Sequence, residues 1–289
     1  LLGGMSLFES IVHAFSTAGT GGFGIYADSV ARYSPYIQWV LAIFMFLFGV
    51  NFNLYYLIVA RKIGAALNSR ELWVYTAIVL GAGGIIFVDL WRNCSMFADS
   101  SVGDTVRTAF FHVSSLVTTT GFTASDFNAW PSLSQGVLFI ILFLGGCAGS
   151  TAGGLKMSRI ILLFKLIGRE LRQLIHPRSV NSVKFEGKAV NEQTLFSVST
   201  YFSVYMVIVA GGFLTLCFDP HITDFKTVLS SVVSCFNNVG PILGNAGANG
   251  TLADYSPFSK VVLSFLMLMG RLEIYPILLA LSPSTWTKR

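Results

Sequence analysis

The chain has 289 residues, of which 53% are hydrophobic and 11% are charged, and its formal net charge is +5. A soluble domain carries about 25% charged residues, so this chain lacks the charges that would solvate its exterior. The composition excludes a disordered chain, a disulfide-stapled secreted domain and an ordinary cytosolic enzyme. It predicts an all-α polytopic membrane protein.

Five apolar stretches are candidates for membrane spans, because a helix needs about 20 apolar residues to cross the hydrocarbon core. They cover residues 36–60, 72–90, 133–166, 195–218 and 258–281. The third stretch is too long for one crossing and has glycines in its middle. Shorter, half-apolar segments precede the first, third and fifth stretches, and segments of this length are typical of re-entrant helices.

The charges orient these spans. Basic residues lie between the first two spans, between the third and fourth, and at the C-terminus: Arg61, Lys62, Arg70, Lys156, Arg159, Lys165, Arg169, Arg172, Arg178, Lys184, Lys188, Lys288 and Arg289. The aspartates fall on the opposite side: Asp28, Asp89, Asp99, Asp104, Asp126, Asp219, Asp224 and Asp254. By the positive-inside rule the basic connections and the C-terminus are cytoplasmic. A basic surface for nucleic acid would not be divided by spans, so we expect membrane lipid and no nucleic acid as a partner.

An internal repeat links the three short segments. In the first two, a histidine (His13, His112) precedes a Gly-Phe pair by nine residues, and threonines stand just before the glycine. The third segment is more distant and ends in Asn238-Val239-Gly240-Pro241. The repeating unit is therefore a span, a short re-entrant helix, a polar glycine-centred stretch and a second span.

Such a unit suits the passage of a dehydrated cation. Backbone carbonyls can replace the ion's water if several extended strands point them at one axis, and glycine adopts the required dihedral angles at low cost. The C-terminal end of each short helix adds negative partial charge. No charged residue lies in the three stretches, which favours a filter of carbonyls over a ring of carboxylates. The candidate filter residues are Thr20, Gly21, Gly22, Phe23, Thr119, Thr120, Gly121, Phe122, Asn238, Val239, Gly240 and Pro241.

These strings resemble the TrkH/KtrB superfamily of potassium transporters over nearly the whole chain. The resemblance implies a potassium-channel-like fold in which four units of one chain surround one pore. It implies K⁺ as the transported ion, bound by the filter carbonyls, with Gly22, Gly121 and Gly240 as filter glycines and no bound cofactor. It also implies the inner (cytoplasmic) membrane, a homodimer and a cytoplasmic nucleotide-binding regulatory subunit of the TrkA or KtrA type.

The third stretch is interrupted by five glycines in ten residues, which cannot stay stably helical because each costs roughly 1 kcal/mol against alanine. In lipid such a loop would leave backbone groups unsatisfied, so it must face a cavity. The residues alone fit either a mobile gate or a packing motif of small residues. The resemblance favours a gate loop below the filter, formed by Gly145, Gly146, Gly149, Ser150, Thr151, Gly153, Gly154 and Lys156.

Two ionisable residues, Arg271 and Glu273, lie within the last stretch. Charges at membrane depth are costly and usually face a cavity or each other. Being two residues apart, they do not share a helical face. We expect Arg271 to face the pore as a barrier to cations and Glu273 to meet another helix; an Arg–Glu pair that holds helices together is the alternative.

The repeats divide the chain into a partial unit (1–70: re-entrant helix, filter stretch and second span), a complete unit with a broken second span (71–190) and a second complete unit (191–289). A four-fold pore needs four filter stretches, so we expect a C-terminal portion of a longer transporter. The leading prediction is K⁺ uptake. A Na⁺-coupled secondary transporter is the alternative. An intramembrane enzyme is disfavoured, because no paired carboxylates, Ser–His arrangement or metal cluster is present at one depth.

Overall fold

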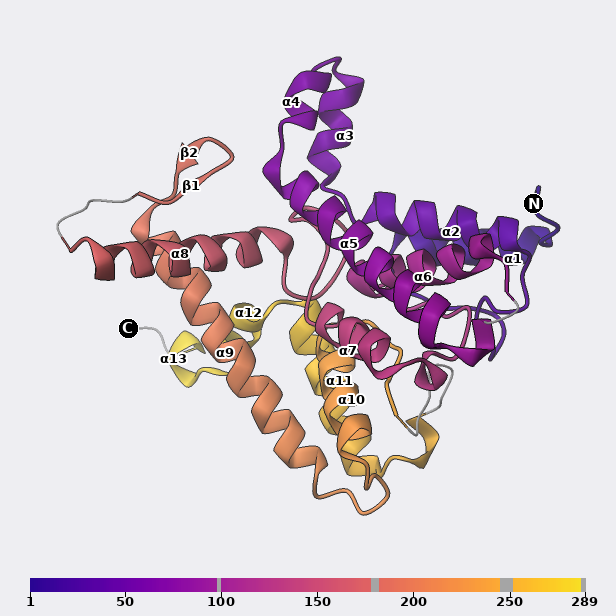
Figure 1. Ribbon diagram of the computed structural model, residues 1–289. Coiled ribbons are helices and arrows are strands. Elements are labelled where there is room, and N and C mark those ends of the chain that lie inside the picture. Colours follow the sequence, from indigo (N-terminus) through magenta and orange to yellow (C-terminus); the bar gives the residue numbers. More distant parts are fainter. Residues whose placement is uncertain (98–99, 178–181, 245–251, 287–289) are drawn as a thin grey trace.

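The computed structural model describes residues 1–97, 100–177, 182–244 and 252–286 (Figure 1). Asp99, Arg178, Lys288 and Arg289, used above to orient the spans, lie outside the described residues. Within that part helices predominate. One short hairpin interrupts the helices, in which β1 (Lys184–Phe185) pairs antiparallel with β2 (Lys188–Ala189).

Two single helices, α5 (Arg70–Asn93) and α9 (Glu192–Leu216), are long and apolar enough to cross a membrane. Among the described residues, two bent helix pairs are also long and apolar enough when each pair is counted as one span: α2 (Pro35–Phe48) with α3 (Phe52–Val59) at 91°, and α11 (Pro257–Arg271) with α12 (Ile274–Leu281) at 116°. The stretch 133–166 divides into α7 (Ser132–Ile141) and α8 (Met157–Ile175). Smaller helical elements complete the chain: α4 (Ile63–Leu67), α13 (Pro283–Trp286), η1 (Ser95–Phe97), η2 (Phe127–Ala129) and η3 (Leu252–Asp254).

The bends differ from the continuous spans expected over 36–60 and 258–281, and each has a local cause. In the first, the Asn51 side chain accepts a hydrogen bond from the Asn53 amide and so starts a new helix. In the second, Glu273 has a φ of 64°, which ends the regular helix after Arg271. Left-handed backbone at a non-glycine residue is uncommon and breaks the helical ladder.

The three short segments form helices α1 (Leu7–Ala18), α6 (Val102–Val117) and α10 (Phe225–Phe236). Each begins at a capping side chain. Ser6 and Glu9 form a reciprocal capping box on α1, Ser101 caps α6 and Asp224 caps α10. Such caps satisfy amides that would otherwise lack a partner at the helix start. Helix α6 packs between α5 and α2, and α10 packs between α9 and α11.

Neighbouring units are joined by matching contacts. Arg107 of α6 donates to Gln38 of α2 at 3.0 Å, and the Gln38 amide donates to two carbonyls of the preceding connection. One unit later, Lys226 of α10 donates to Gln135 of α7, which likewise donates to two carbonyls. The same cation–amide contact therefore fixes α6 against α2 and α10 against α7.

Buried aspartates join the two spans of a unit. Asp89 of α5 accepts hydrogen bonds from the amide and hydroxyl of Ser134 at the start of α7. Asp219, just after α9, accepts from the Ser256 amide at the start of α11. A carboxylate at a helix N-terminus is favoured by the helix dipole as well as by the hydrogen bonds.

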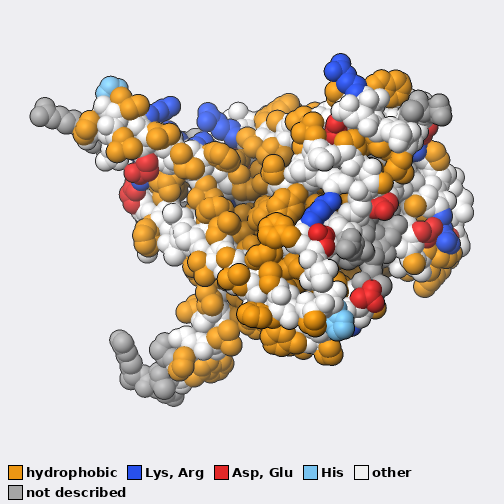
Figure 2. Space-filling view, turned by 60° about the horizontal axis from the view of Figure 1, so that its bottom comes forward, with side chains coloured by type: hydrophobic (Ala, Val, Ile, Leu, Met, Phe, Trp, Pro, Cys, Tyr) orange, Lys and Arg blue, Asp and Glu red, His pale blue; other side chains and the backbone are white. Residues whose placement is uncertain are grey.

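Large hydrophobic side chains remain exposed over much of the exterior, including Phe15, Val59, Leu80, Ile140 and Phe196. Figure 2 shows hydrophobic side chains spread across one face, with few charged side chains among them. Exposed apolar surface on this scale is typical of lipid-facing helices.

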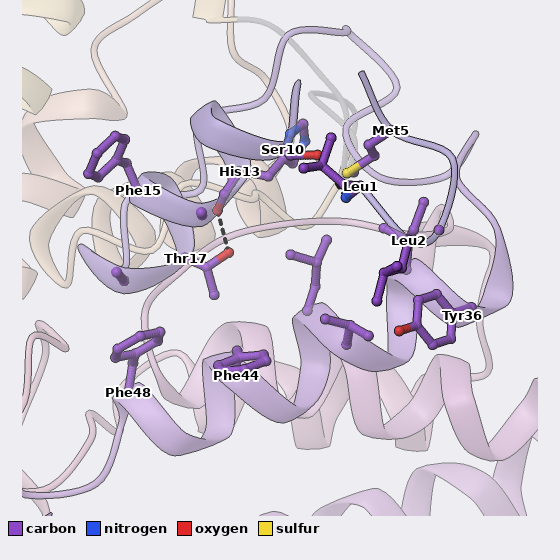
Figure 3. A pocket seen from close by; sticks show the side chains of 16 residues that line it. Leu1, Leu2, Met5, Ser10, His13, Phe15, Thr17, Tyr36, Phe44 and Phe48 are labelled. Carbon is purple, nitrogen blue, oxygen red and sulfur yellow. Dashed lines mark hydrogen bonds between the residues drawn. The ribbon is translucent and has the colours of Figure 1, made fainter. Parts of the chain in front are cut away.

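Helix α1 has fewer helix neighbours than α6 and α10. Among the described residues it packs chiefly on α2. An apolar groove of about 660 Å³ lies between α1 and α2, and Figure 3 shows it with Phe15, Phe44 and Phe48 at one end and Leu1 and Leu2 at the other.

Asp219 gives a test of the contact between spans in the third unit. Burial raises its pKa, but hydrogen bonds from Ser259, His221 and Ser256 outweigh burial and hold the pKa below its usual range. A depressed native pKa stabilises the fold above the unfolded-state value and loses that effect as pH falls. We predict that Asp219→Asn lowers the free energy of unfolding at neutral pH by about 1.5–3 kcal/mol. The loss of stability as pH falls should be smaller in this variant than in the unsubstituted protein.

The measurement is thermal unfolding in detergent followed by intrinsic fluorescence across a pH series. The control is Asp254→Asn, because Asp254 is exposed and has no hydrogen bond to the described part of the chain. Equal pH profiles for Asp219→Asn and the unsubstituted protein would contradict this role.

Candidate ion pathway

Each short helix ends in the same backbone turn. The residues two positions before the repeat glycines, Thr20, Thr119 and Asn238, have φ values of 48°, 54° and 56°. Gly22 and Gly121 follow with φ values of 67° and 88°, and Gly240 has 104°. Side-chain-bearing residues adopt such values rarely, so three at matching positions show that the three stretches share one conformation. We call 20–23, 119–122 and 238–241 the glycine segments.

The glycine segments lie against one another in chain order. A Cβ added at Gly22 would overlap the Thr120 carbonyl, and one added at Gly121 would overlap the Val239 carbonyl. Only glycine permits these approaches between backbones. A Cβ at Gly240 would meet nothing within 4 Å in the described structure. The three segments together line a hollow of about 280 Å³.

The aromatic and proline residues after the glycines are placed unequally. Phe122 is fully buried and stacks on the His13 ring, with 5.5 Å between the ring centroids. Phe23 is 76% exposed. Pro241 is buried and lines the hollow beside Gly121. The matching sequence positions therefore have different neighbours in the three units.

The stretch 145–156 forms a loop that packs directly against the glycine segments. The Thr20 hydroxyl donates to the Thr151 carbonyl at 2.9 Å, and the Gly153 amide donates to the Thr119 hydroxyl at 2.6 Å. A Cβ at Gly153 would lie 2.6 Å from the Asn237 carbonyl. One loop thus contacts the ends of all three short helices, including the residue beside Asn238.

The base of this loop is held firmly. Gly145 donates to the Leu155 carbonyl, and Met157 donates to the Gly146 carbonyl, so the two ends of the loop are joined. The Cys147 amide donates to the Gly49 carbonyl, and the Phe52 amide donates to the Gly149 carbonyl; both partners lie at the bend between α2 and α3.

The tip of the loop, 150–154, has fewer contacts. Ser150 donates to the Cys147 carbonyl, and Lys156 donates to the Ala152 carbonyl. Gly154 has a φ of 66°, which turns the chain back toward α8. Apart from these internal bonds, the tip is held mainly by its contacts with the glycine segments and with Arg271.

Arg271 and Glu273 point to different partners. Arg271 donates to the Thr151 carbonyl at 3.2 Å, whereas Glu273 forms a 2.8 Å ion pair with Arg159 of α8. Both residues line a cavity of about 220 Å³ on the inner side of the loop, together with Lys156 and Tyr201. The direct Arg271–Glu273 pair, considered above as an alternative, is not formed.

Two residues that contact the loop or Glu273 were not predicted from the sequence to do so. Glu71 of α5 is 5% exposed, and its carboxylate accepts the Ala148 amide of the loop at 2.7 Å. Arg159 was noted only as a cytoplasmic positive charge, yet it holds Glu273 and lies 4.1 Å from the centre of the Tyr201 ring. A glutamate beside the basic Arg70 was a signal for Glu71, since a carboxylate at the start of a span needs a specific partner.

Comparison with known proteins gives consistent relatives. A family profile described as TrkH, cation transport protein, matches residues 2–288. The Trk system potassium uptake protein TrkH of Salmonella typhimurium is 37% identical over 98% of this chain and 58% of its own length. TrkG of Escherichia coli, also named a Trk system potassium uptake protein, is 33% identical over 99% and 58%.

A solved structure agrees with these relatives. The crystal structure of the potassium transporter TrkH from Vibrio parahaemolyticus matches with a TM-score of 0.88 and 33% identity, over 99% of this chain and 60% of that one. The chain therefore spans less than two thirds of the length of these relatives. They are transport proteins rather than enzymes, and the expected all-α polytopic membrane fold is confirmed. The chain belongs to the TrkH family of cation transport proteins.

Proposed function

We propose that the protein takes up K⁺ through a channel-like pore in which the glycine segments form a carbonyl selectivity filter and the loop 145–156 is the gate. One observation carries this proposal: a single glycine-rich loop contacts the first residues of two glycine segments and Asn237, the residue just before the third. A segment in that place blocks the route from the outer hollow to the inner cavity.

The chemistry of the segments supports a cation as cargo. Their twelve residues include no charged side chain. The short helices α1, α6 and α10 end at the segments, so their negative ends lie next to the pathway. Carbonyl and hydroxyl oxygens are the ligands that replace the hydration shell of K⁺ in selective pores. The relatives named above are described as potassium uptake proteins.

The finer expectations on assembly belong to the same proposal. They comprise a bacterial inner-membrane location with the C-terminus in the cytoplasm, a homodimer, a nucleotide-binding regulatory subunit of the TrkA or KtrA type, and no cofactor besides the transported K⁺. The resemblance in sequence is their support. A Na⁺-coupled transporter makes a different prediction in the first experiment below.

Rubidium uptake tests the function directly. Liposomes that contain the purified full-length protein should accumulate ⁸⁶Rb⁺ down an imposed gradient, and external K⁺ should compete while Na⁺ should not. Protein-free liposomes are the control. Rubidium uptake that requires Na⁺ would favour the coupled transporter, and no uptake by folded protein would refute the proposal.

Arg271 gives a test of the barrier. Its positive charge borders the inner cavity, and its hydrogen bond holds the loop tip. Arg271→Ala removes both effects, so we predict Rb⁺ uptake several-fold faster than in the unsubstituted protein. Arg271→Lys keeps the charge and should give an intermediate rate. Lys260→Ala, at the opposite end of α11, is the control. Unchanged uptake in folded Arg271→Ala would refute the role of Arg271 as a barrier.

Serines six residues before the repeat glycines brace two of the three segments. Ser115 donates to the Phe122 carbonyl at 2.7 Å, and Ser234 accepts from the Gly240 amide at 3.0 Å. The matching Ser16 hydroxyl is buried without a partner among the described residues. The chain therefore contains its own control for the effect of this hydroxyl on filter geometry.

We predict that Ser115→Ala and Ser234→Ala weaken the preference for Rb⁺ over Na⁺ by about five-fold, since a lost buried hydrogen bond costs roughly 1 kcal/mol and loosens the segment. Ser16→Ala should leave the preference unchanged. The measurement is the ratio of ⁸⁶Rb⁺ to ²²Na⁺ uptake, with Ser115→Thr as a conservative variant that restores the hydroxyl. Equal ratios for all three alanine variants would show that the serines do not set selectivity.

A further inference from the structure

A further cavity, of about 510 Å³, lies between α8, the start of α5 and the strand that leads into the hairpin. Its volume is in the range of small-molecule sites. Of the nine described residues that line it, five are basic and none is acidic: Arg70, Phe164, Lys165, Gly168, Arg169, Arg172, Ser182, Val183 and Lys184. It does not share residues with the ion pathway described above.

The positive charge of this cavity is only partly balanced. Arg169 pairs with Glu192 at 2.6 Å and with Glu170 at 3.1 Å. Its Nε atom is buried and has no hydrogen-bond partner among the described residues. Arg70, Arg172 and Lys184 form no ion pair with any described carboxylate. Uncompensated cations around a hollow attract an anion of several oxygens, and arginine favours phosphate.

The surface beside the cavity is apolar. Phe164, Ile167, Leu171 and Leu174 of α8 are all exposed, and their spacing places them along one side of the helix. Phe164 also lines the cavity. A basic hollow next to an apolar helical stripe matches the two parts of an anionic phospholipid, whose headgroup needs cations and whose chains need apolar surface.

We propose that this cavity binds a phosphate group, supplied by an anionic phospholipid of the cytoplasmic leaflet, and that the bound lipid affects the gate loop. The first part stands on the cavity alone. The second part rests on the proposed function.

The path from the cavity to the loop is short. Lys165 donates to the Lys184 carbonyl at 2.6 Å and fixes the hairpin strand to α8. At the hairpin turn, Glu186 accepts from the Ser69 hydroxyl and the Glu71 amide at the start of α5. The Glu71 side chain in turn accepts the loop amide of Ala148. A phosphate between Arg70 and Lys184 would therefore draw together the two elements that position Glu71.

Binding is tested without transport. Purified protein in neutral detergent is titrated with phosphatidylglycerol or phosphatidylcholine, and the unfolding midpoint is followed. Phosphatidylglycerol should raise the midpoint and phosphatidylcholine should not. Arg70→Gln and Lys184→Gln should each weaken the apparent affinity about five-fold. Lys188→Gln, in the paired strand but outside the cavity, is the matched control and should behave as the unsubstituted protein.

Competition distinguishes the source of the phosphate. Inorganic phosphate and glycerol phosphate, added at matched ionic strength, should not displace the lipid. Displacement by either would show a site for soluble phosphates and overturn the lipid assignment. Equal lipid responses in Arg70→Gln, Lys184→Gln and Lys188→Gln would refute the site itself.

The coupling to the gate needs the uptake assay. ⁸⁶Rb⁺ uptake is compared in vesicles of phosphatidylcholine alone and of phosphatidylcholine mixed with phosphatidylglycerol. The rate should depend on phosphatidylglycerol in the unsubstituted protein and much less in Glu186→Gln, although Glu186→Gln should still bind the lipid. Equal lipid dependence in both proteins would overturn the coupling. Absence of uptake in every vesicle would instead refute the proposed function and leave the binding result standing.

Discussion

The hydrogen bond from the Gly153 amide to the Thr119 hydroxyl is the contact on which the arrangement of the pathway depends. It joins the glycine-rich loop to the end of α6, the central one of the three short helices. The space there is narrow, because a side chain at 153 would strike the Asn237 carbonyl. A loop can fit against three helix ends only if its tip lacks a Cβ, so the glycine content of this stretch follows from the geometry of the segments above it.

The sequence predicted those features that depend on local signals. The short half-apolar segments and their repeated motif located α1, α6 and α10, and glycine content located the break between α7 and α8. The bends after Gly49 and Arg271 were not predicted, because hydropathy is continuous across them. The anchor from Glu71 to Ala148 was also missed, since it joins residues 77 apart in the chain and depends on tertiary packing.

Identical sequence patterns acquire different surroundings in successive units. The His112 ring has hydrogen-bonding partners on both sides, whereas Nε2 of His13 is buried without one in the described structure. Ser115 is bonded where Ser16 is not, and Phe122 is buried where Phe23 is exposed. In each pair, the residue that lacks a partner or is exposed belongs to the first unit, which contains α1. The same sequence pattern therefore specifies each repeating unit, while contacts with the rest of the chain determine which of its polar groups find hydrogen-bond partners.

The second spans of the three units, which begin with α2, α7 and α11, share one more feature. It explains the origin of the cavity next to the glycine segments. Gln38, Gln135 and Lys260 occupy matching positions near the starts of α2, α7 and α11, and eleven residues later stand Gly49, Gly146 and Arg271. Helices α2 and α11 end at that point, and α7 ends five residues before it, at Ile141. Each of the three spans is therefore interrupted by that point.

A shared break removes three helices from the space beneath the glycine segments and leaves room for irregular backbone, which survives at membrane depth only when protein or a cavity satisfies it. The second unit fills that room with its loop. The third places a side chain there: Gly270 packs against the Phe236 carbonyl, where a Cβ would overlap, and the next residue, Arg271, donates to the Thr151 carbonyl. The loop 145–156 and Arg271 thus both occupy the space left by the interrupted spans, where they contact each other.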